Sequence, residues 1–309
     1  MSTAGSIIAA VLMGASVARG SVLAEAVRTG ASRVQAAFVS VGAGARPVGM
    51  GEAFTAVADD ASAVTWNPGG LGQIHELRAV VAHDVAGADV GLSYAAVAIP
   101  AGPGTVGLGI TALMFGSYDR RSDDGTKLGT DSVMDVAGTV SYGFANPGWL
   151  GGGGWSGLGV EVVQETAGGS LVGLSAGSVL PAGGGLTVAW AAQHVGPGRD
   201  GFSLPAVVKA GAAYALPGFG RIVADAGYPL VSRQPLVAAG VEIAPHRMFA
   251  VRAGYKWRGA QPGLRGLTGL TAGLGVRLGR LGIDYAYQPF GDLVTSHRFA
   301  LVWGTGGAI

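Results

Sequence analysis

Apolar and polar side chains alternate along most of the chain between residues 76 and 303. Segments of about 9 to 14 residues, in which every second side chain is apolar, are separated by Gly, Pro and Asp turns. We count about fourteen such segments. The connections between them alternate between short and long along the chain, and one of the long connections is expected over 122–131. The pattern predicts an all-β chain of about fourteen antiparallel strands.

Charged residues in these segments fall on one face of each strand. In 249–257, FAVRAGYKW, Arg252 and Lys256 share one face and the alternate positions are apolar or aromatic. A strand in a transmembrane barrel presents apolar side chains to lipid and keeps charges in the lumen. The pattern therefore predicts a transmembrane barrel whose inward charges are Arg78, Asp84, Asp135, Glu161, Glu165, Lys209, Arg221, Asp225, Glu242, Arg252, Lys256, Arg277, Asp284 and Arg298.

Composition favours the same fold class. Charged residues make up 13% of the 309 residues, about half the share usual in soluble domains, and the mean hydropathy is +0.42. No segment after the N-terminal region has the roughly 18 consecutive apolar residues of a membrane helix. High hydropathy without membrane helices is compatible with two fold classes, a glycine-rich soluble β-protein and a membrane β-barrel. The low share of charged residues favours the barrel. The net charge of +1 argues against a nucleic-acid partner.

The N-terminal region is typical of an exported protein. Residues 7–17 form an apolar core, and Ala24-Glu25-Ala26 offers a small-x-small cleavage site, so 1–26 is predicted to be a signal peptide. The usual positive charge at the start is missing, and a short buried helix is the alternative. We expect a signal peptide at 1–26, a plug at 27–75, a barrel at 76–303 and a tail at 304–309, in the bacterial outer membrane.

The predicted plug differs in composition from the strands. Residues 41–72 are rich in glycine, show a short helical pattern around Phe54, Val57 and Ala58, and reach Asn67-Pro68, where a helix cannot continue. The order of its motifs resembles the N-terminal signature of the PorV/PorQ family of outer-membrane proteins, which are relatives of the FadL-type channels. The matching motifs are Gly44-Ala45-Arg46, Met50-Gly51, Ala56 to Ser62 and Trp66-Asn67-Pro68, and the closing hairpin of the family is similar to Tyr287 to Leu293 with His297-Arg298.

The resemblance implies a fourteen-stranded barrel with a luminal hatch. The family usually has Ala where this chain has Gly69, which leaves the shape of the hatch turn open. The hatch residues implied are Arg46, Gly49, Gly51, Asp59, Asp60, Trp66, Asn67, Pro68 and Gly69.

Two functions follow from the resemblance. PorV/PorQ proteins imply a shuttle that binds the C-terminal domains of cargo exported by type IX secretion, together with other secretion components. FadL-type channels imply passage of long-chain fatty acids or other hydrophobic small molecules, with Asn67, Pro68 and Gly69 as a movable stopper. An apolar cavity from the loops to the hatch would favour transport, and a filled lumen would favour the shuttle.

Other chemistry is less well supported by the sequence. The glycine pairs at 42 and 44 and at 49 and 51 follow no strand and precede no Lys-Ser/Thr, so a phosphate loop is not expected. Asp59-Asp60 suits a cap for a short helix over 61–64 better than a cation site, and Asp123-Asp124-Gly125 suits a hairpin turn. The five histidines have no metal-ligand spacing. We expect no cofactor, no metal and no enzymatic activity, and we expect the luminal charges to pair with one another and with the plug.

Overall fold

The computed structural model describes residues 34–85, 90–147, 152–166, 169–199, 202–258, 268–290 and 295–304. The predicted signal peptide at 1–26 and most of the tail at 304–309 lie outside these residues, so both stay predictions. None of the described helices is long and apolar enough to cross a bilayer.

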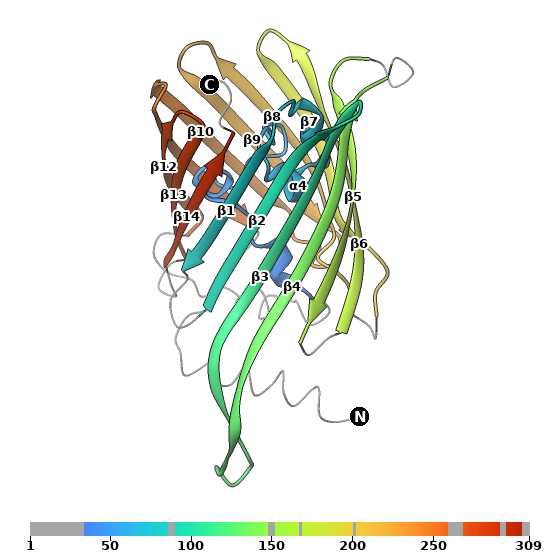
Figure 1. Cartoon of the computed structure of the whole chain (residues 1–309), viewed down its shortest axis with the longest axis vertical. Coiled ribbons are helices and arrows are strands. Elements are labelled where there is room, and N and C mark those ends of the chain that lie inside the picture. Colours follow the sequence, from blue (N-terminus) through green and yellow to red (C-terminus); the bar gives the residue numbers. More distant parts are fainter. Residues whose placement is uncertain are drawn as a thin grey trace.

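Fourteen antiparallel strands form one closed barrel (Figure 1), which confirms the predicted fold class. Each strand pairs with its neighbours in sequence, and β1 closes the ring against β14, with His83 opposite Phe299. The strands are β1 Arg78–Val85, β2 Val90–Ala101, β3 Gly104–Arg121, β4 Lys127–Ala145, β5 Trp155–Glu165, β6 Gly169–Gly183, β7 Leu186–Val195, β8 Val207–Leu216, β9 Gly220–Pro229, β10 Leu236–His246, β11 Phe249–Arg258, β12 Leu270–Leu278, β13 Leu281–Pro289 and β14 Thr295–Trp303.

The alternating pattern of the sequence becomes an outer and an inner face. Outward side chains are apolar and remain exposed, for example Val81 at 58%, Leu158 at 64% and Leu301 at 56%. Inward positions hold small residues and the charged residues named above, of which Arg252 and Arg298 are almost completely buried. The outer surface is therefore suited to lipid, and the lumen is where polar groups meet.

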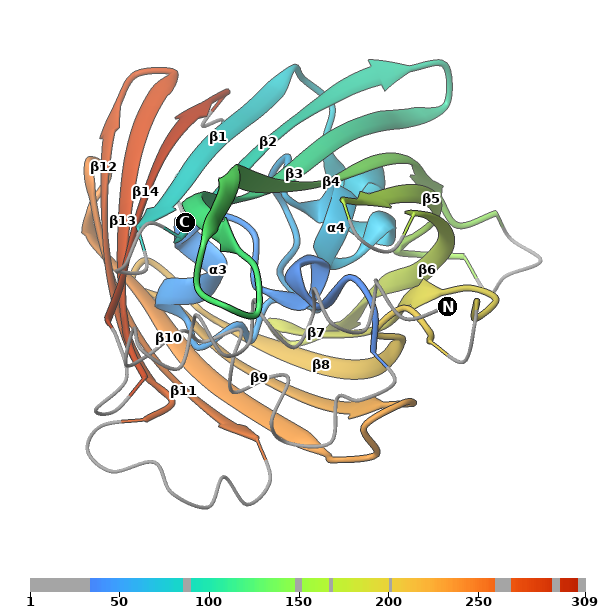
Figure 2. The ribbon, with the colours of Figure 1, turned by 90° about the horizontal axis from the view of Figure 1, so that it is seen from below.

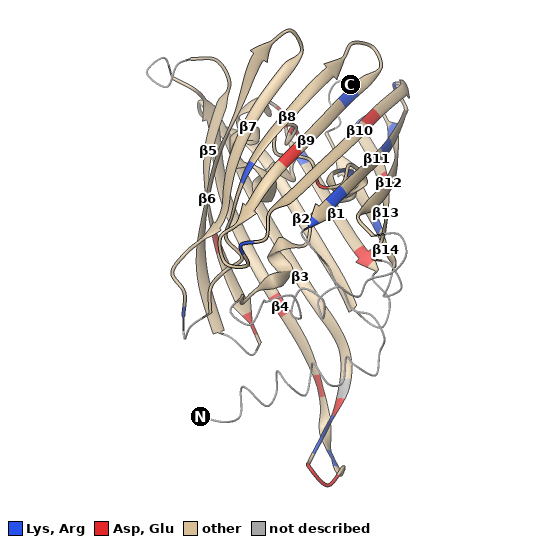
Figure 3. Ribbon diagram, turned by 180° about the vertical axis from the view of Figure 1, so that it is seen from behind, with Lys and Arg blue, Asp and Glu red and all other residues tan. Residues whose placement is uncertain are grey.

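Strands β3 and β4 extend well beyond their neighbours (Figure 1) and form an arm at residues 116–135. The predicted long connection over 122–131 is wrong, because the strands continue to Arg121 and from Lys127. The turn between them is tight: Gly125 has φ of +87°, and the Asp124 carboxylate accepts the backbone N–H of Thr126 at 2.9 Å. Charges of both signs lie along the arm (Figure 3), and ion pairs such as Lys127 with Asp119 at 2.6 Å support the extended hairpin.

The predicted plug, of which residues 34–75 are described and which we call the hatch, occupies the lumen (Figure 2). Its described helices are all short: η1 Ala37–Ser40, α3 Ala45–Gly49, α4 Ala63–Trp66 and η2 Pro68–Gln73. The predicted helical pattern around Phe54, Val57 and Ala58 is wrong, because these residues form a single turn. The backbone N–H groups of Phe54 and Thr55 donate to the Asp225 carboxylate of β9 at 3.1 and 3.0 Å instead of to a preceding helical turn. A tertiary acceptor therefore replaces the local helix.

Two apolar cores result. The larger one joins the hatch to the inner wall and includes the fully buried side chains of Met50, Phe54, Val64, Leu71 and Ile74. The second one lies towards the arm end, where Phe38 is packed by side chains of β2 to β6 and the β7–β8 connection; these are Leu92, Leu113, Ala137, Val163, Leu171 and Leu204. Residues 34–41, which we call the strap, thus cover part of the lumen at the arm end.

Candidate functional site: the hatch interface and the luminal cavity

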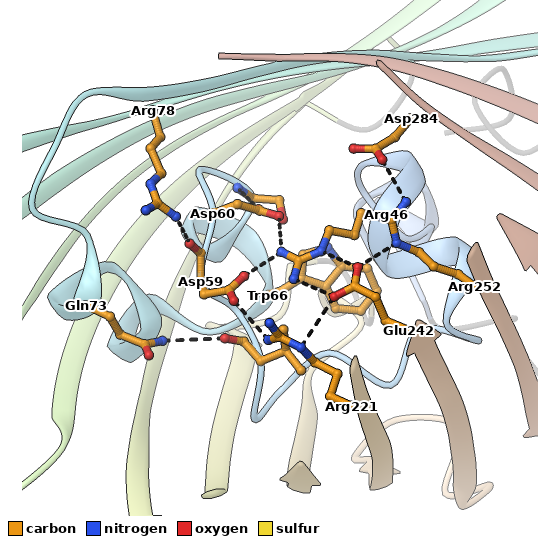
Figure 4. A network of polar contacts seen from close by, with 12 residues as sticks. Arg46, Asp59, Asp60, Trp66, Gln73, Arg78, Arg221, Glu242, Arg252 and Asp284 are labelled. Atoms are coloured by element: carbon orange, nitrogen blue, oxygen red, sulfur yellow. Dashed lines mark hydrogen bonds and ion pairs between the residues drawn. The ribbon is translucent and has the colours of Figure 1, made fainter. Parts of the chain in front are cut away.

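Arg46, at the start of the hatch, is the centre of an ionic network (Figure 4) that we call the latch. Helix α3 places its guanidinium beside β10, where it donates to both oxygens of Glu242 at 2.8 and 2.9 Å. It also reaches Asp59 at 2.5 Å and Asp60 at 3.0 Å. Arg46 therefore ties the hatch to the barrel wall and holds the 59–60 turn within the hatch, which suits the planar fork of arginine.

The latch continues along the wall from Glu242. Arg252 donates to Glu242 at 2.6 Å and to Asp284 at 2.7 Å, and Arg277 pairs with Asp284 at 2.9 Å. Arg221 of β9 lies 3.0 Å from Asp59 and 3.4 Å from Glu242. Glu242 and Asp284, the two fully buried carboxylates of the latch, thus each have at least two cationic partners, so their charges are compensated away from water.

The electrostatics of the hatch residues favour their charged forms. Burial alone would raise the pKa of Asp59, but the positive charges of Arg46 and Arg221 outweigh it and lower this pKa to about 2. Burial opposes the charge on Arg46, but Asp59, Glu242 and Asp60 raise its pKa well above the usual value. Both groups are ionised across the physiological range, so the latch is closed at neutral pH.

Asp60 also shapes the hatch locally. Its carboxylate accepts the backbone N–H of Ser62 at 2.8 Å, immediately before α4 begins at Ala63. The predicted cap of a helix over 61–64 is wrong, because α4 spans Ala63–Trp66 and no side chain caps its first turn; Asp60 instead accepts the N–H of the residue before this helix. The remaining carboxylate oxygen of Asp60 is taken by Arg46, so the structure brings this residue into the latch.

Asn67 fixes the hatch to the opposite wall. Its side-chain N–H group donates to the carbonyl oxygens of Thr55 at 2.9 Å and of Ser178 and Trp190 at 3.3 Å, while its side-chain oxygen accepts the N–H of Gly69 at 3.0 Å. Pro68 then begins η2, with its fixed φ at the first position. Asn67 is completely buried, so it acts in this structure as a fastening of the hatch.

Backbone-to-backbone packing supplements these polar contacts. A Cβ added to Gly254 of β11 would lie 2.1 Å from the amide nitrogen of Gly51, and one added to Gly49 would lie 3.1 Å from the Cα of Gly273. At Gly69 an added Cβ would lie 2.7 Å from the carbonyl oxygen of Gly177. The hatch turn is therefore fitted to glycine at the position where the similar family usually has alanine.

Sequence reasoning missed the neutral donors that hold the hatch. Thr105, Ser141, Gln193 and Thr271 are inward-facing residues that donate side-chain hydrogen bonds to hatch carbonyl oxygens, at 2.6, 3.1, 2.5 and 3.2 Å for the shortest contact of each. The alternating pattern does identify these residues as polar side chains at inward positions of strands. It does not identify their partners, because the acceptors are backbone carbonyl groups, which every residue has.

The remaining inward charges lie around the latch or nearer the arm end. Arg298 binds Asp84 and the carbonyl oxygen of Gly42, and Arg78 donates to the carbonyl oxygen of Asp59 at 2.5 Å. Towards the arm, Glu165 accepts the N–H of Ala36 in the strap at 2.8 Å, and Asp135 accepts the N–H of Thr166 at 2.8 Å. The last two carboxylates are thus engaged by backbone groups instead of by the expected cations.

A cavity of about 240 Å³ lies between the hatch and the connections at the arm end. Its hatch side is formed by Trp66 and Glu52, and its outer side by residues such as Pro205, Ser232 and Phe290. The strap forms another wall. The lining is mixed, with apolar side chains from Val39, Val41, Val207 and Leu236 among polar ones. The lumen is therefore neither completely filled nor purely apolar.

Three cations line one side of this cavity: Lys209, Lys256 and Arg258. Lys256 binds the hatch carboxylate of Glu52, with Arg258 at 4.0 Å from it, and Lys209 lies 4.8 Å above the ring of Trp66. Burial would raise the pKa of Glu52, but these positive charges lower it to about 2. On another wall, Glu161 pairs with His194 at 2.6 Å. Asp225 of β9 also acts electrostatically on Lys209, so three cations face two carboxylates on this side of the cavity.

Comparison with solved structures finds a similar fold in proteins of known structure. The Pseudomonas putida toluene transporter TodX is similar over 78% of this chain and 92% of its own, with 10% identity and a TM-score of 0.54. A Pseudomonas aeruginosa FadL homologue is similar over 83% of this chain and 97% of its own, with 12% identity and a TM-score of 0.53. The chain shares their fold. No protein-family model and no curated protein matches the sequence.

Proposed function

We propose that the protein is an outer-membrane channel for hydrophobic small molecules. The observation that carries this proposal is the cavity between the hatch and the arm end, with apolar side chains on several walls and a cationic cluster beside the hatch. The named neighbours, a toluene transporter and a FadL homologue, support such a role at the level of the fold. The latch keeps the membrane sealed while the cavity holds the ligand.

The cationic cluster favours a ligand with an acidic group. Lys209 contacts the Trp66 ring and lines the same cavity as Val207 and Leu236, so an ammonium group and an apolar surface are offered together. A carboxylate bound there gains a charge-assisted hydrogen bond while its chain remains on the apolar walls. Long-chain fatty acids fit this description better than neutral aromatic compounds do.

A binding measurement on the purified barrel tests the proposal. We expect a fluorescent long-chain fatty acid to bind, and Lys209→Gln to weaken its binding about tenfold or more, because a hydrogen bond to a charged group is lost. Lys127→Gln removes the same charge from the arm and should leave binding unchanged. Equal binding by all three proteins would contradict the role of the cationic cluster, and binding by none of them would contradict the channel proposal for this ligand class.

The second candidate is the type IX secretion shuttle that the resemblance to PorV/PorQ proteins implies. The arm supports it, because a polar hairpin that projects beyond the barrel offers a surface to another protein. Mass spectrometry of material co-purified gently from the native outer membrane distinguishes the two. Exported proteins with a common C-terminal β-domain would favour the shuttle, whereas a stoichiometric fatty acid without a protein partner would favour transport.

A further inference from the structure

Two neighbouring turns at the end of the barrel opposite the arm carry exposed cations. Arg247 lies in the β10–β11 turn and Arg280 in the β12–β13 turn, and both side chains are exposed. The turns are adjacent, because Phe249 pairs with Val276 and the N–H of Arg277 donates to the carbonyl oxygen of Met248 at 2.8 Å. The two cations therefore belong to one patch.

His246 adds a donor to this patch. The backbone N–H of Met248 donates to its Nδ1 at 3.2 Å, so the proton of the neutral ring lies on Nε2. His246 is exposed. Its ring centroid is 6.2 Å from that of Phe249. The patch thus has two guanidinium groups and one imidazole N–H, a set of donors that suits phosphate oxygens.

Among the residues that the structure describes, the carboxylates near these turns are already engaged. Asp284 is paired with Arg252 and Arg277, and Glu242 with Arg46, Arg221 and Arg252. Glu76, which precedes β1 at the same end, lies 3.6 Å from Arg78. An anion from outside the chain can therefore meet the charges of Arg247 and Arg280 directly.

The position of the patch indicates the kind of anion. Phe249, Leu278, Leu281 and Trp303 lie at the ends of the adjoining strands and face outward, with exposed fractions between 40% and 53%. Such an apolar and aromatic border marks the level at which the hydrocarbon of the bilayer ends. The guanidinium groups on the turns just beyond it stand at the height of lipid headgroups.

The orientation of the barrel indicates the leaflet. The connections at this end include turns of only a few residues, whereas the arm extends from the other end. In bacterial barrels short turns face the periplasm. Two other short turns on this rim are uncharged: 102–103 is Gly-Pro and 184–185 is Gly-Gly. The positive charge is therefore concentrated on one side of the barrel.

We propose that Arg247, Arg280 and His246 form a binding site for the phosphate headgroup of an anionic phospholipid in the periplasmic leaflet. The site is separate from the luminal cavity and does not depend on which molecule the channel carries. It would fix one side of the barrel to the anionic lipid and set its depth in the bilayer. The acyl chains of that lipid lie against the Phe249–Trp303 border.

Native mass spectrometry after extraction from vesicles containing phosphatidylcholine and phosphatidylglycerol tests this site. We expect the full-length barrel to retain phosphatidylglycerol, and the R247Q/R280Q variant to bind it about 30-fold more weakly, which is about 1 kcal/mol for each arginine. The R247K/R280K variant should retain most of the binding, because it keeps both charges. The R120Q/R121Q variant removes two charges from the arm instead and should bind as the unchanged protein does.

Three results would overturn the proposal. One is equal retention of phosphatidylcholine and phosphatidylglycerol by the unchanged barrel. Another is an equal loss in the arm variant, which would show a general effect of net charge. The third is displacement of the lipid by millimolar inorganic phosphate, which would identify a site for the free anion. The folded state of each variant is checked by its heat-dependent mobility in gel electrophoresis.

Discussion

Arg46 of the hatch and Glu242 of β10 form a two-point ion pair, with contacts of 2.8 and 2.9 Å across 196 positions of sequence. Glu242 is completely buried and also meets Arg221 and Arg252. One carboxylate therefore compensates cations from the hatch and from two strands. This relationship makes Glu242 the residue on which docking of the hatch depends most.

We expect Glu242→Gln to destabilise the barrel by about 3–5 kcal/mol, because it leaves buried guanidinium groups without their carboxylate. The measurement is the urea midpoint of unfolding in detergent, with conductance across planar bilayers as a second readout for a loosened hatch. Asp131→Asn breaks the exposed pair with Arg120 at 3.4 Å and should change stability by less than about 1 kcal/mol. Similar shifts in the two variants would show that the latch is not a main support of the hatch.

Asn67→Asp tests the hydrogen bonds by which Asn67 fixes the hatch to the barrel wall, and it leaves the size of the side chain nearly unchanged. The three carbonyl oxygens that accept from Asn67 would then face a carboxylate, while the hydrogen bond from Gly69 is kept. We expect a loss of about 3 kcal/mol in unfolding free energy, since a buried donor is replaced by a charged acceptor. Gln164→Glu makes the same chemical change at an exposed strand end and should have little effect. A stable Asp variant would mean that Asn67 does not hold the hatch in place.

The sequence predicted the facing of the strands but not the contacts of the lumen. Period-two alternation assigns residues such as Glu161 and Arg252 to the inner face, because charge on the lipid face is costly. It says nothing about partners, since Arg46 and Glu242 meet only after the barrel closes. The helical pattern at Phe54 failed for the same reason: the Asp225 carboxylate, 171 residues away, accepts the N–H that a helix would use.

The arm and the glycine contacts show a second limit of sequence reasoning. Residues 122–131 contain turn formers and charges, which are typical of a loop, yet ion pairs such as Arg120 with Asp131 extend the hairpin through them. Among the glycines, Gly138 has no atom within 4 Å of an added Cβ, whereas Gly254 meets the hatch backbone. The alternation places Gly254 on the inner face and Gly138 on the outer face, but it does not show that the hatch backbone lies against Gly254, because that contact arises from where the hatch lies.

These two glycines give a matched test of backbone packing. Gly254→Ala places a Cβ 2.1 Å from the amide nitrogen of Gly51, so either β11 or the hatch must move. We expect a loss of about 3 kcal/mol or failure of the hatch to dock. Gly138→Ala adds the same methyl group on the outer face and should be tolerated. Heat-dependent gel mobility and the urea midpoint measure both, and equal tolerance would contradict close packing of the hatch on β11.

The pH dependence of stability follows from Glu52 and Asp59 of the hatch. Lys256 and Arg258 outweigh the effect of burial and lower the pKa of Glu52 from 4.5 to about 2, and Arg46 and Arg221 likewise lower that of Asp59 from 3.8 to about 2. A pKa lowered by folding contributes stability that is complete above the unfolded value and is lost as pH falls to the folded value. The barrel should therefore keep its stability from pH 7 to about 5 and lose it progressively between about pH 4.5 and 2.

Glu52→Gln separates the contribution of Glu52 from acid unfolding in general. For the unchanged protein, the pKa shift of Glu52 corresponds to about 3 kcal/mol of pH-dependent stability. The variant should be less stable at pH 7, because Lys256 loses its carboxylate partner, and its stability should fall less steeply below pH 4.5. Asp131→Asn on the arm should leave the profile unchanged. Unfolding curves in urea between pH 7 and 2 measure all three proteins, and parallel curves for Glu52→Gln and the unchanged barrel would show that the Glu52 contact contributes nothing to docking of the hatch.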